Sequence, residues 1–457
     1  MKLFNFLLLS WIVAQTFYFG NYGPDLGPLS AVRPDRVLFI LMAISFVWGW
    51  ARHKTVATKW EWPERLLVGL TTLCIVSFLV SGSLNDDSDG KNKWLNALFN
   101  ITVFPCATYF WVRALPYRKE FAVSVLKVLC FLGVYLSFTA VCEHYEWQSL
   151  VWPAYIMDES LGTHFGRARG PFMESVAMGR VLTMVFAGWL VLRLASKPLL
   201  RNFATFCLVL TLAGIYFTAT RGPWLGLGLV LITFLVSETP VRKTVLRLVA
   251  CIAVAAAIGL SNKFSLGQNN LFFGRQNTVT DRIVTWLVSM DMIKAHPVFG
   301  IGFGRFNAKW EDYYKPSNGL EFDGFDGSHN TWLSVAAEVG LPGLALYLVM
   351  AVLMWRRCLN TYRSLDPEHT FERSFILMVV GLLAAYVLTG WFSDLRWNTV
   401  QNTLMFLMLG LVSAMSRDLE KQRSDVDNED ASETPLESSH ELVVSSTDEM
   451  AGSPVSS

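Results

Sequence analysis

Long apolar stretches, separated by short polar connections, recur along most of the chain. Each is close to the length of about 17 to 25 residues that a helix needs to cross a bilayer. None shows the alternation of apolar and polar residues that is typical of a membrane barrel, so each stretch is predicted to be a helix. The pattern therefore predicts an all-α polytopic membrane protein with twelve spans, at about residues 3–20, 36–51, 65–82, 94–114, 121–143, 172–195, 199–219, 222–237, 243–260, 333–355, 374–392 and 397–415.

Composition agrees with a protein that lies in the bilayer. Hydrophobic residues make up 53% of the 457 residues and charged residues only 16%, whereas soluble domains carry about 25% charged residues. The net charge of +1 argues against a nucleic-acid partner. None of the seven cysteines belongs to a Cys-x-x-Cys motif, which argues against a zinc knuckle and against a disulfide framework.

Basic residues divide the connections into two sets. The connections of one set, taken with both termini, hold 21 lysines and arginines, whereas the short connections of the other set hold 8. By the positive-inside rule the first set is cytoplasmic. The rule therefore predicts cytoplasmic termini and places the long polar loop of residues 261–329 on the outer face.

The two ends of the chain are predicted to behave differently. Residues 1–416 form the membrane domain, and its first helix is expected to be retained because Ala14-Gln15-Thr16 is a poor signal-peptide cleavage site. Residues 417–457 are acidic, rich in serine and without an aromatic residue. Such a segment buries too little apolar surface to fold alone, so we expect a disordered cytoplasmic tail.

The long loop holds an arginine in a setting that suits an anion. Thr280 or Asp281 would cap an amphipathic helix lying at the membrane surface, with Arg282 in its first turn. A cation in the first turn opposes the helix dipole, and a bound anion would explain it. The alternative is a solvated interfacial arginine.

His329 lies at the exit of this loop, just before a helical run that Gly340 and Pro342 are expected to stop or kink. The positive end of a helix dipole favours a neutral imidazole there. A neutral imidazole is a competent general base. The alternative is a histidine whose ring is satisfied by local hydrogen bonds.

Three more arginines are candidates on the same face. Arg221 joins two apolar helices with almost no loop, and at that depth a charge needs a partner, either lipid phosphate or a bound diphosphate. Arg169 precedes the sixth span and adds positive charge there. Arg180 lies inside that span and is a site candidate by default. Its alternative is an ion pair with one of three acids, Glu143, Glu174 and Glu338.

Two other motifs have simpler explanations. Pro297 to Gly304 contains alternate glycines, but no strand precedes them, so they indicate a structural turn rather than a dinucleotide site. Asp86, Asp87 and Asp89 could hold a divalent metal, yet they lie in a segment typical of a solvated loop. No metal site is predicted.

Five motifs occur in a fixed order. They are Thr220-Arg221-Gly222, Arg282-x-x-x-Trp286, Pro297-x-x-Gly300-x-Gly302, His329-Asn330-Thr331-Trp332-Leu333 and Glu338-x-Gly340-x-Pro342-Gly343. Together they resemble the O-antigen ligase family, a superfamily that includes O-antigen polymerases and protein O-oligosaccharyltransferases. The similar segment covers about residues 205–360.

The resemblance implies a membrane glycosyltransferase of the bacterial inner membrane that needs no metal and no other cofactor. It would move a glycan from an undecaprenyl-diphosphate carrier to lipid A-core, or a related glycolipid or polysaccharide acceptor, on the periplasmic face. Arg221 and Arg282 match the arginines that bind the donor diphosphate, with Arg169 and Arg180 as further candidates. His329 matches the histidine that activates the acceptor hydroxyl. A single in-line displacement would invert the anomeric centre.

Three alternatives remain open at this point. A polymerase of the same superfamily would use a second carrier-linked glycan as the acceptor, and a protein O-oligosaccharyltransferase would use a protein. A transporter would predict internal repeats and broken helices at the bilayer midplane. The polar residues gather at one face instead, which disfavours the transporter.

Overall fold

The computed structural model describes residues 2–18, 23, 33–52, 55, 59–81, 97–195, 197–237, 242–243, 245–247, 249–250, 277–315 and 327–433. Within these ranges every regular element is a helix. The protein is therefore an all-α polytopic membrane protein, as the apolar pattern predicted.

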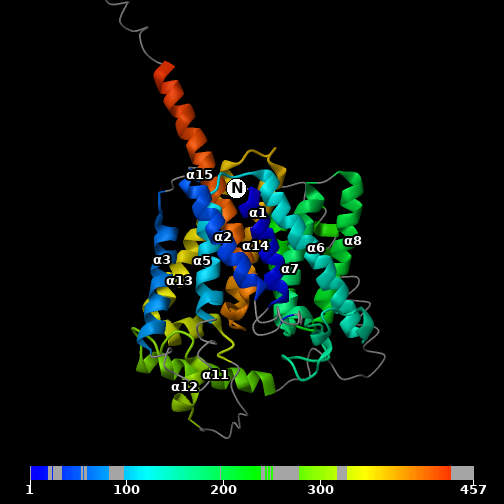
Figure 1. Ribbon diagram of the computed structural model, residues 1–457, viewed down its shortest axis with the longest axis vertical. Helices are drawn as coiled ribbons and strands as arrows, with labels where there is room; N and C mark the ends of the chain where they lie inside the picture. Colours follow the sequence, from blue (N-terminus) through cyan, green and yellow to red (C-terminus); the bar gives the residue numbers. More distant parts are fainter. Residues whose placement is uncertain are drawn as a thin grey trace, which may run out of the picture.

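The described helices form an upright bundle (Figure 1). Eight of them are long and apolar enough to cross a membrane: α2 (Pro34–Ala51), α3 (Trp62–Val80), α6 (Lys119–His144), α7 (Ser175–Leu194), α8 (Pro198–Phe217), α13 (Thr331–Ser364), α14 (Thr370–Thr389) and α15 (Thr399–Glu433). Two shorter apolar helices are α1 (Lys2–Phe17) and α9 (Arg221–Val236), and the π-helix η2 (Phe99–Val103) continues directly into α5 (Phe104–Arg113).

These helices correspond to eleven of the twelve predicted spans. The remaining one, at 243–260, lies largely outside the described residues. The boundaries differ most at α13, which extends to Ser364, and at α15. α15 continues as one helix to Glu433, so residues 417–433 are helical where a disordered tail was predicted, and 434–457 lie outside the described residues.

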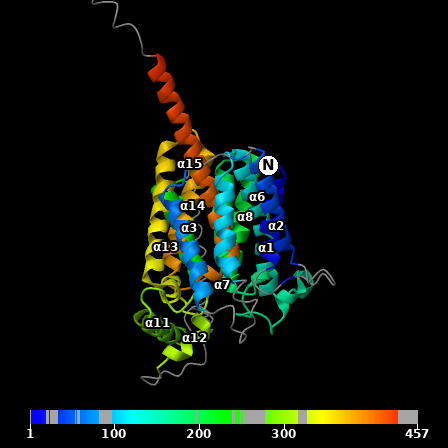
Figure 2. The ribbon, with the colours of Figure 1, turned by 60° about the vertical axis from the view of Figure 1, so that its left-hand side comes forward.

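The two ends of the bundle are different (Figures 1 and 2). One end carries α11 (Asn277–Ala295) and α12 (Phe306–Tyr313), and we call it the loop face. At the other end, the opposite face, α1 begins and α15 projects beyond the bundle. The termini of the described chain and the long loop thus lie at opposite ends, as the alternation of spans requires.

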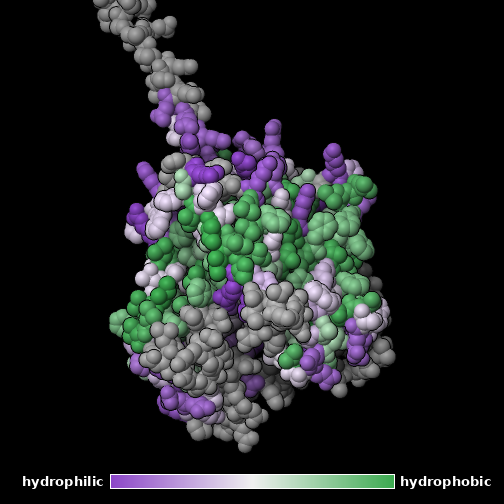
Figure 3. All heavy atoms as spheres, viewed as in Figure 1, coloured by the Kyte–Doolittle hydropathy of each residue, from purple (hydrophilic) through white to green (hydrophobic). Residues whose placement is uncertain are grey.

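Hydrophobic residues form a band across the middle of the face shown in Figure 3, with hydrophilic residues above and below it. Large apolar side chains remain exposed along this band, among them Phe6, Ile44, Val76 and Phe206. Exposed apolar side chains of this size suit contact with lipid rather than with water. Hydrophilic side chains crowd the opposite face in the same view, where the basic connections lie.

α7 occupies the centre of the bundle and packs against α6, α8, α9 and α14. Nearly all of its side chains are buried, because the helix is apolar on every side rather than on one stripe. Gly179 permits the closest approach, since a Cβ there would lie 2.4 Å from Cγ of Pro223 at the start of α9. The helix therefore fixes the position of the residues in its first two turns.

α13 is broken at Gly340, whose φ of 84° is not helical. The Pro297–Gly302 segment runs alongside this break: Ile301 donates its N–H to the Ala337 carbonyl (2.8 Å), and Leu341 donates to that of Pro297 (2.8 Å). A Cβ at Gly300 would lie 2.3 Å from the Glu338 carbonyl carbon. The alternate glycines thus form the structural turn that was predicted, and the predicted kink of α13 is confirmed.

Candidate active site

α11 begins at Asn277, three residues before the predicted cap, so Arg282 lies in its second turn rather than its first. Arg282 therefore interacts more weakly with the helix dipole than predicted, because that effect falls off within one turn. Two faces of α11 are apolar. Val284, Val288 and Met292 are buried, while Ile283 and Leu287 remain about half exposed and available to a membrane surface.

α11 is joined directly to the His329 loop. The Thr285 hydroxyl lies one turn beyond Arg282 and donates to the carbonyl oxygens of Arg282 (2.9 Å) and Ser328 (3.2 Å). Ser328 immediately precedes His329. The contact brings Arg282 and His329 into one region although 46 residues separate them in the sequence.

Arg221 and Arg282 are electrostatic neighbours. Burial, and after it the positive charge of Arg221, lowers the pKa of the half-buried Arg282 guanidinium. Arg221 is exposed and is the first residue of α9, after a tight turn in which Ala219 has a φ of 48°. Two like charges held close together raise each other's energy, and an anion between them would relieve it.

His329 is half-buried and held in a left-handed conformation with a φ of 51°, which is uncommon for a residue other than glycine. Its neighbours hold it from both sides. Asn330 caps α13 by accepting the N–H groups of Trp332 (2.9 Å) and Leu333 (3.0 Å), and donates its own N–H to the Ser328 hydroxyl (3.1 Å). Asn330 is thus the N-cap of α13.

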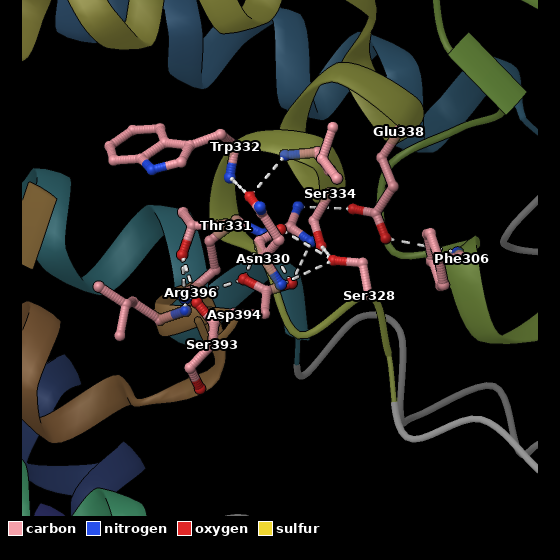
Figure 4. Close-up of polar contacts among 12 residues, drawn as sticks. Phe306, Ser328, Asn330, Thr331, Trp332, Ser334, Glu338, Ser393, Asp394 and Arg396 are labelled. Atoms are coloured by element: carbon pink, nitrogen blue, oxygen red, sulfur yellow. Dashed lines mark hydrogen bonds and ion pairs between the residues drawn. The ribbon is translucent and has the colours of Figure 1, made fainter. Parts of the chain in front are cut away.

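The start of α13 is also joined to the connection between α14 and α15 (Figure 4). The Thr331 hydroxyl donates to the Ser393 carbonyl (2.9 Å) and accepts the N–H of Leu395 (2.9 Å), and the Thr331 N–H donates to Gly390 (2.8 Å). These bonds fix the first residues of α13, and with them the backbone of His329.

A buried ion cluster beside this connection was not predicted. Arg396 pairs with Glu338 (2.6 Å) and with Asp394 (2.6 Å), and the Glu338 carboxylate also accepts the N–H of Phe306 (3.3 Å) (Figure 4). The cluster ties α13, α12 and the α14–α15 connection together. A glutamate within an apolar span was a sign that a basic partner exists, but the sequence did not show that Arg396 supplies it.

Arg169 is placed differently from the other candidates. Its side chain is buried, and the guanidinium donates to carbonyl oxygens of residues 156 (2.9 Å), 158 and 161, while its backbone N–H donates to Glu143 (3.0 Å). These bonds organise the segment between α6 and α7. A guanidinium engaged in this way is poorly placed to bind a diphosphate, and we leave it out of the donor site.

Arg180 does not form the ion pair that was considered for it. Glu338 pairs with Arg396, and Glu143 accepts backbone N–H groups of Arg169 and Gly170. Glu174, Tyr386 and Asp394 act on the charge of Arg180 without a hydrogen bond or ion pair to it. Its site role therefore stays a prediction.

The metal alternative lies beyond what the structure describes, because residues 86, 87 and 89 are outside the described ranges. Among the residues that are described, no group of three His, Cys, Asp or Glu side chains could hold a metal ion.

Comparison with known proteins identifies the segment that carries this site. Residues 206–348 match the family model described as O-antigen ligase. Over 322 residues the chain is 25% identical to exopolysaccharide production protein ExoQ of Rhizobium meliloti (strain 1021). The aligned region covers 63% of this chain and 69% of that protein. The segment with Arg221, Arg282 and His329 therefore belongs to the O-antigen ligase family, as the ordered motifs predicted.

Proposed function

We propose that the protein is a glycosyltransferase that moves a glycan from undecaprenyl diphosphate to a lipid A-core, related glycolipid or polysaccharide acceptor. The observation that carries the proposal is the convergence of Arg221, Arg282 and His329. The positive charge of Arg221 acts on Arg282, and the helix of Arg282 is hydrogen-bonded to the residue before His329. Two cations beside a candidate base suit the displacement of a diphosphate by a hydroxyl.

The reaction follows from these roles. The acceptor oxygen attacks the anomeric carbon, its proton passes to the imidazole of His329, and the bond from that carbon to the phosphate oxygen breaks. The diphosphate leaves with the electron pair, and Arg221 and Arg282 stabilise the charge that develops on it. One in-line displacement inverts the anomeric centre, and the charge is neutralised by arginines, without a metal ion.

We place the loop face in the periplasm and both termini in the cytoplasm of a bacterial inner membrane. The support is the excess of basic residues in the connections of the opposite face. A donor that is already activated and already across the membrane then supplies the energy for transfer, since cytosolic nucleotides do not reach that face.

The test is transfer by purified full-length protein in lipid nanodiscs that contain a chelator. Glycan on undecaprenyl diphosphate is the donor, and lipid A-core is the acceptor. We expect transfer by the wild type and a loss of about 10²- to 10⁴-fold in His329→Ala, the usual contribution of a general base. His296→Ala is the matched control, because His296 lies on the same face, is exposed, and its imidazole hydrogen-bonds to the Tyr313 hydroxyl (3.0 Å). Full activity in His329→Ala would exclude the proposed base.

A polymerase is the second candidate, and the name of the relative supports it. That protein is described by exopolysaccharide production, which suits stepwise growth of repeats as well as transfer of a finished chain. Product length in the same assay separates the two: one added chain of fixed length indicates a ligase, and a ladder of repeats formed without lipid A-core indicates a polymerase.

A further inference from the structure

Three large aromatic side chains are exposed on the connection between α14 and α15. Trp391 is 49% exposed, Phe392 is 45% exposed, and Trp397, the last residue of the 3₁₀-helix η6 (Leu395–Trp397), is 39% exposed. We call these three residues the aromatic surface. In the part of the chain that the structure describes, none of them packs against another aromatic ring. Exposed apolar side chains that gather in one place commonly mark a binding site.

Other exposed tryptophans at the loop face have ring partners within the chain. Trp147 stacks on Tyr145, with ring centroids 5.4 Å apart, and Trp152 packs against Phe17 at 5.2 Å. Trp147 is as exposed as Trp391, so the two sets of residues differ in packing rather than in exposure. The aromatic surface therefore adds no ring packing to the fold, and its exposed rings are available to a ligand.

The connection that carries the aromatic surface is fixed against the start of α13 (Figure 4). The Thr331 N–H donates to the carbonyl of Gly390 (2.8 Å), the residue just before the aromatic surface. The Thr331 hydroxyl donates to the Ser393 carbonyl (2.9 Å) and accepts the N–H of Leu395 (2.9 Å), whose side chain is buried. A surface whose backbone is already fixed loses little conformational entropy when it binds a ligand.

His329 is joined to this connection on one side and to α11 on the other. Thr285 of α11 donates to the carbonyl of Ser328, the residue before His329 (3.2 Å), whereas Thr331, two residues after His329, binds the connection. In the proposed reaction His329 takes the proton of the acceptor hydroxyl, while the donor is held by arginines of α9 and α11. The connection is therefore an element beside His329 that holds none of the proposed donor-binding residues, which suits the acceptor.

Two buried amide groups follow the aromatic surface directly. Nδ2 of Asn398 and Oε1 of Gln401 have no hydrogen-bond partner among the described residues. In native proteins almost all buried polar groups are satisfied by protein, ligand or ordered water. A saccharide hydroxyl both donates and accepts, so it can pair with an amide nitrogen and with an amide oxygen, directly or through water.

We propose that the aromatic surface binds sugar rings of the acceptor beside His329; this inference rests on the proposed function. The C–H groups on one face of a sugar ring are weakly positive and pack on the negative face of an aromatic ring. The hydroxyls at the edge of the same sugar suit the amide groups of Asn398 and Gln401. A lipid acyl chain could contact the aromatic rings as well, but it offers no partner to the amides.

The test measures binding of two lipid-free probes to the full-length protein in phosphatidylcholine nanodiscs without donor. One probe is core oligosaccharide released from lipid A, and the other is the oligosaccharide repeat unit. We expect the wild type to bind one of them: core oligosaccharide indicates the acceptor of a ligase, and the repeat unit that of a polymerase. Trp391→Ala combined with Trp397→Ala should lose about tenfold to a hundredfold in affinity for that probe, the usual value of two aromatic contacts.

Trp147→Ala combined with Trp152→Ala is the matched control, because it removes two exposed tryptophans from the same face of the molecule, and it should bind the probe like the wild type. In the transfer assay, the change at Trp391 and Trp397 should raise the KM for the acceptor by a similar factor. The KM for the carrier-linked donor should stay unchanged, which a general loss of structure would not produce.

The inference is overturned if the wild type binds neither probe, or if the folded variant of the aromatic surface binds as tightly as the wild type. An equal loss in the control also overturns it, because the tryptophans would then serve the membrane interface in general. If the alanine variant does not fold, Trp391→Leu combined with Trp397→Leu replaces it and should show a similar loss, since leucine is apolar but has no aromatic face.

Two further outcomes separate this inference from the proposed function. Probe binding that depends on the aromatic surface, without glycan transfer by the wild type, would keep the inference and remove the proposed reaction. Transfer that depends on His329, with an unchanged acceptor KM in the variant of the aromatic surface, would keep the reaction and overturn the inference.

Discussion

At the scale of single residues, Arg282 is the arginine whose surroundings most clearly favour binding of an anionic donor. It is half-buried, the charge of Arg221 acts on it, and no ion pair to it is found in the described residues. A guanidinium in that position gains more from an anion than an exposed one does, because burial strengthens the attraction. The structure thus adds a reason for anion binding that the motif alone did not contain.

Arg282→Met is expected to raise the KM for the glycan-linked diphosphate donor, or to lower kcat/KM, by about tenfold to a hundredfold, because charge-assisted hydrogen bonds to phosphate are lost. The measurement is initial-rate kinetics at varied donor concentration. Lys294→Met is the control: it removes one positive charge from the same helix at a side chain that is 76% exposed. An equal effect of the two changes would show that net charge on α11, rather than the Arg282 contact, is what matters.

The site residues that could be predicted from the sequence are those that lie in recognisable motifs. His329, Arg221 and Arg282 belong to ordered motifs, and their convergence agrees with the shared motif order. The pairing of Arg396 with Glu338 was not predicted, since the two are 58 residues apart and Glu338 was considered as a partner of Arg180 instead. The hydrogen bonds of Arg169 to backbone carbonyl groups were not predicted either, because every residue has a backbone carbonyl and the sequence does not show which of them an arginine will contact.

At the scale of elements, helix existence was predictable and helix ends were not. α11 starts at Asn277, three residues before Thr280, so the residues from Asn277 to Val279 are already helical. α15 continues past its apolar part as one unbroken helix, in which the polar residues up to Glu433 are also helical. Apolar periodicity ends where burial ends, whereas hydrogen bonding along the helix does not have to stop there.

The break in α13 gives a prediction at this scale. Gly340→Ala would place a Cβ 2.1 Å from the Val298 carbonyl oxygen, at a φ of 84° that suits glycine. We expect a loss of about 1–3 kcal/mol in stability, the usual cost of such backbone strain, and lower activity, because the Pro297–Gly302 segment beside the break supports the start of α13. The measurement is the Tm of the purified protein in detergent, together with the transfer rate.

Gly228→Ala is the matched control for that change. Gly228 lies inside α9, a Cβ there meets nothing within 4 Å, and alanine favours a helix. Its Tm should stay the same or rise slightly. A comparable fall in both variants would mean that glycine flexibility in general, and not the geometry of the α13 break, stabilises the protein.

At the scale of the whole molecule, the opposite face is held together by a second buried ion cluster. Glu64 of α3 is fully buried between Arg113 of α5 (3.0 Å) and Arg357 of α13, and Arg357 also donates to Ser413 of α15 (3.1 Å). Arg357 and Glu64 are 293 residues apart in the sequence. From the sequence, these arginines could be used only as basic residues that indicate the cytoplasmic face. Their pairing with Glu64 could not be predicted, since it depends on how the helices pack in the folded bundle.

Arg357→Met should therefore destabilise the bundle strongly, by about 3–5 kcal/mol, because it leaves the buried Glu64 carboxylate with one partner fewer. The adjacent Arg356 is exposed, and Arg356→Met should change Tm little. Thermal unfolding of both variants in the same detergent measures the difference. Since the cluster lies at the end away from His329, the folded fraction of Arg357→Met should keep its KM for the donor. A similar Tm for the two variants would show that the cluster adds no stability.

The arrangement of the bundle also makes the side of the reaction testable. Lys294 is exposed on the loop face and Arg423 is exposed on the part of α15 that projects from the opposite face. A membrane-impermeant maleimide applied to intact spheroplasts should label Lys294→Cys, and should label Arg423→Cys only after the membrane is permeabilised, because the basic connections favour a cytoplasmic opposite face. Of the native cysteines that the structure describes, most are buried, so the unsubstituted protein provides the background signal. The reverse labelling pattern would put Arg221, Arg282 and His329 in the cytoplasm, where a nucleotide-activated sugar becomes the expected donor.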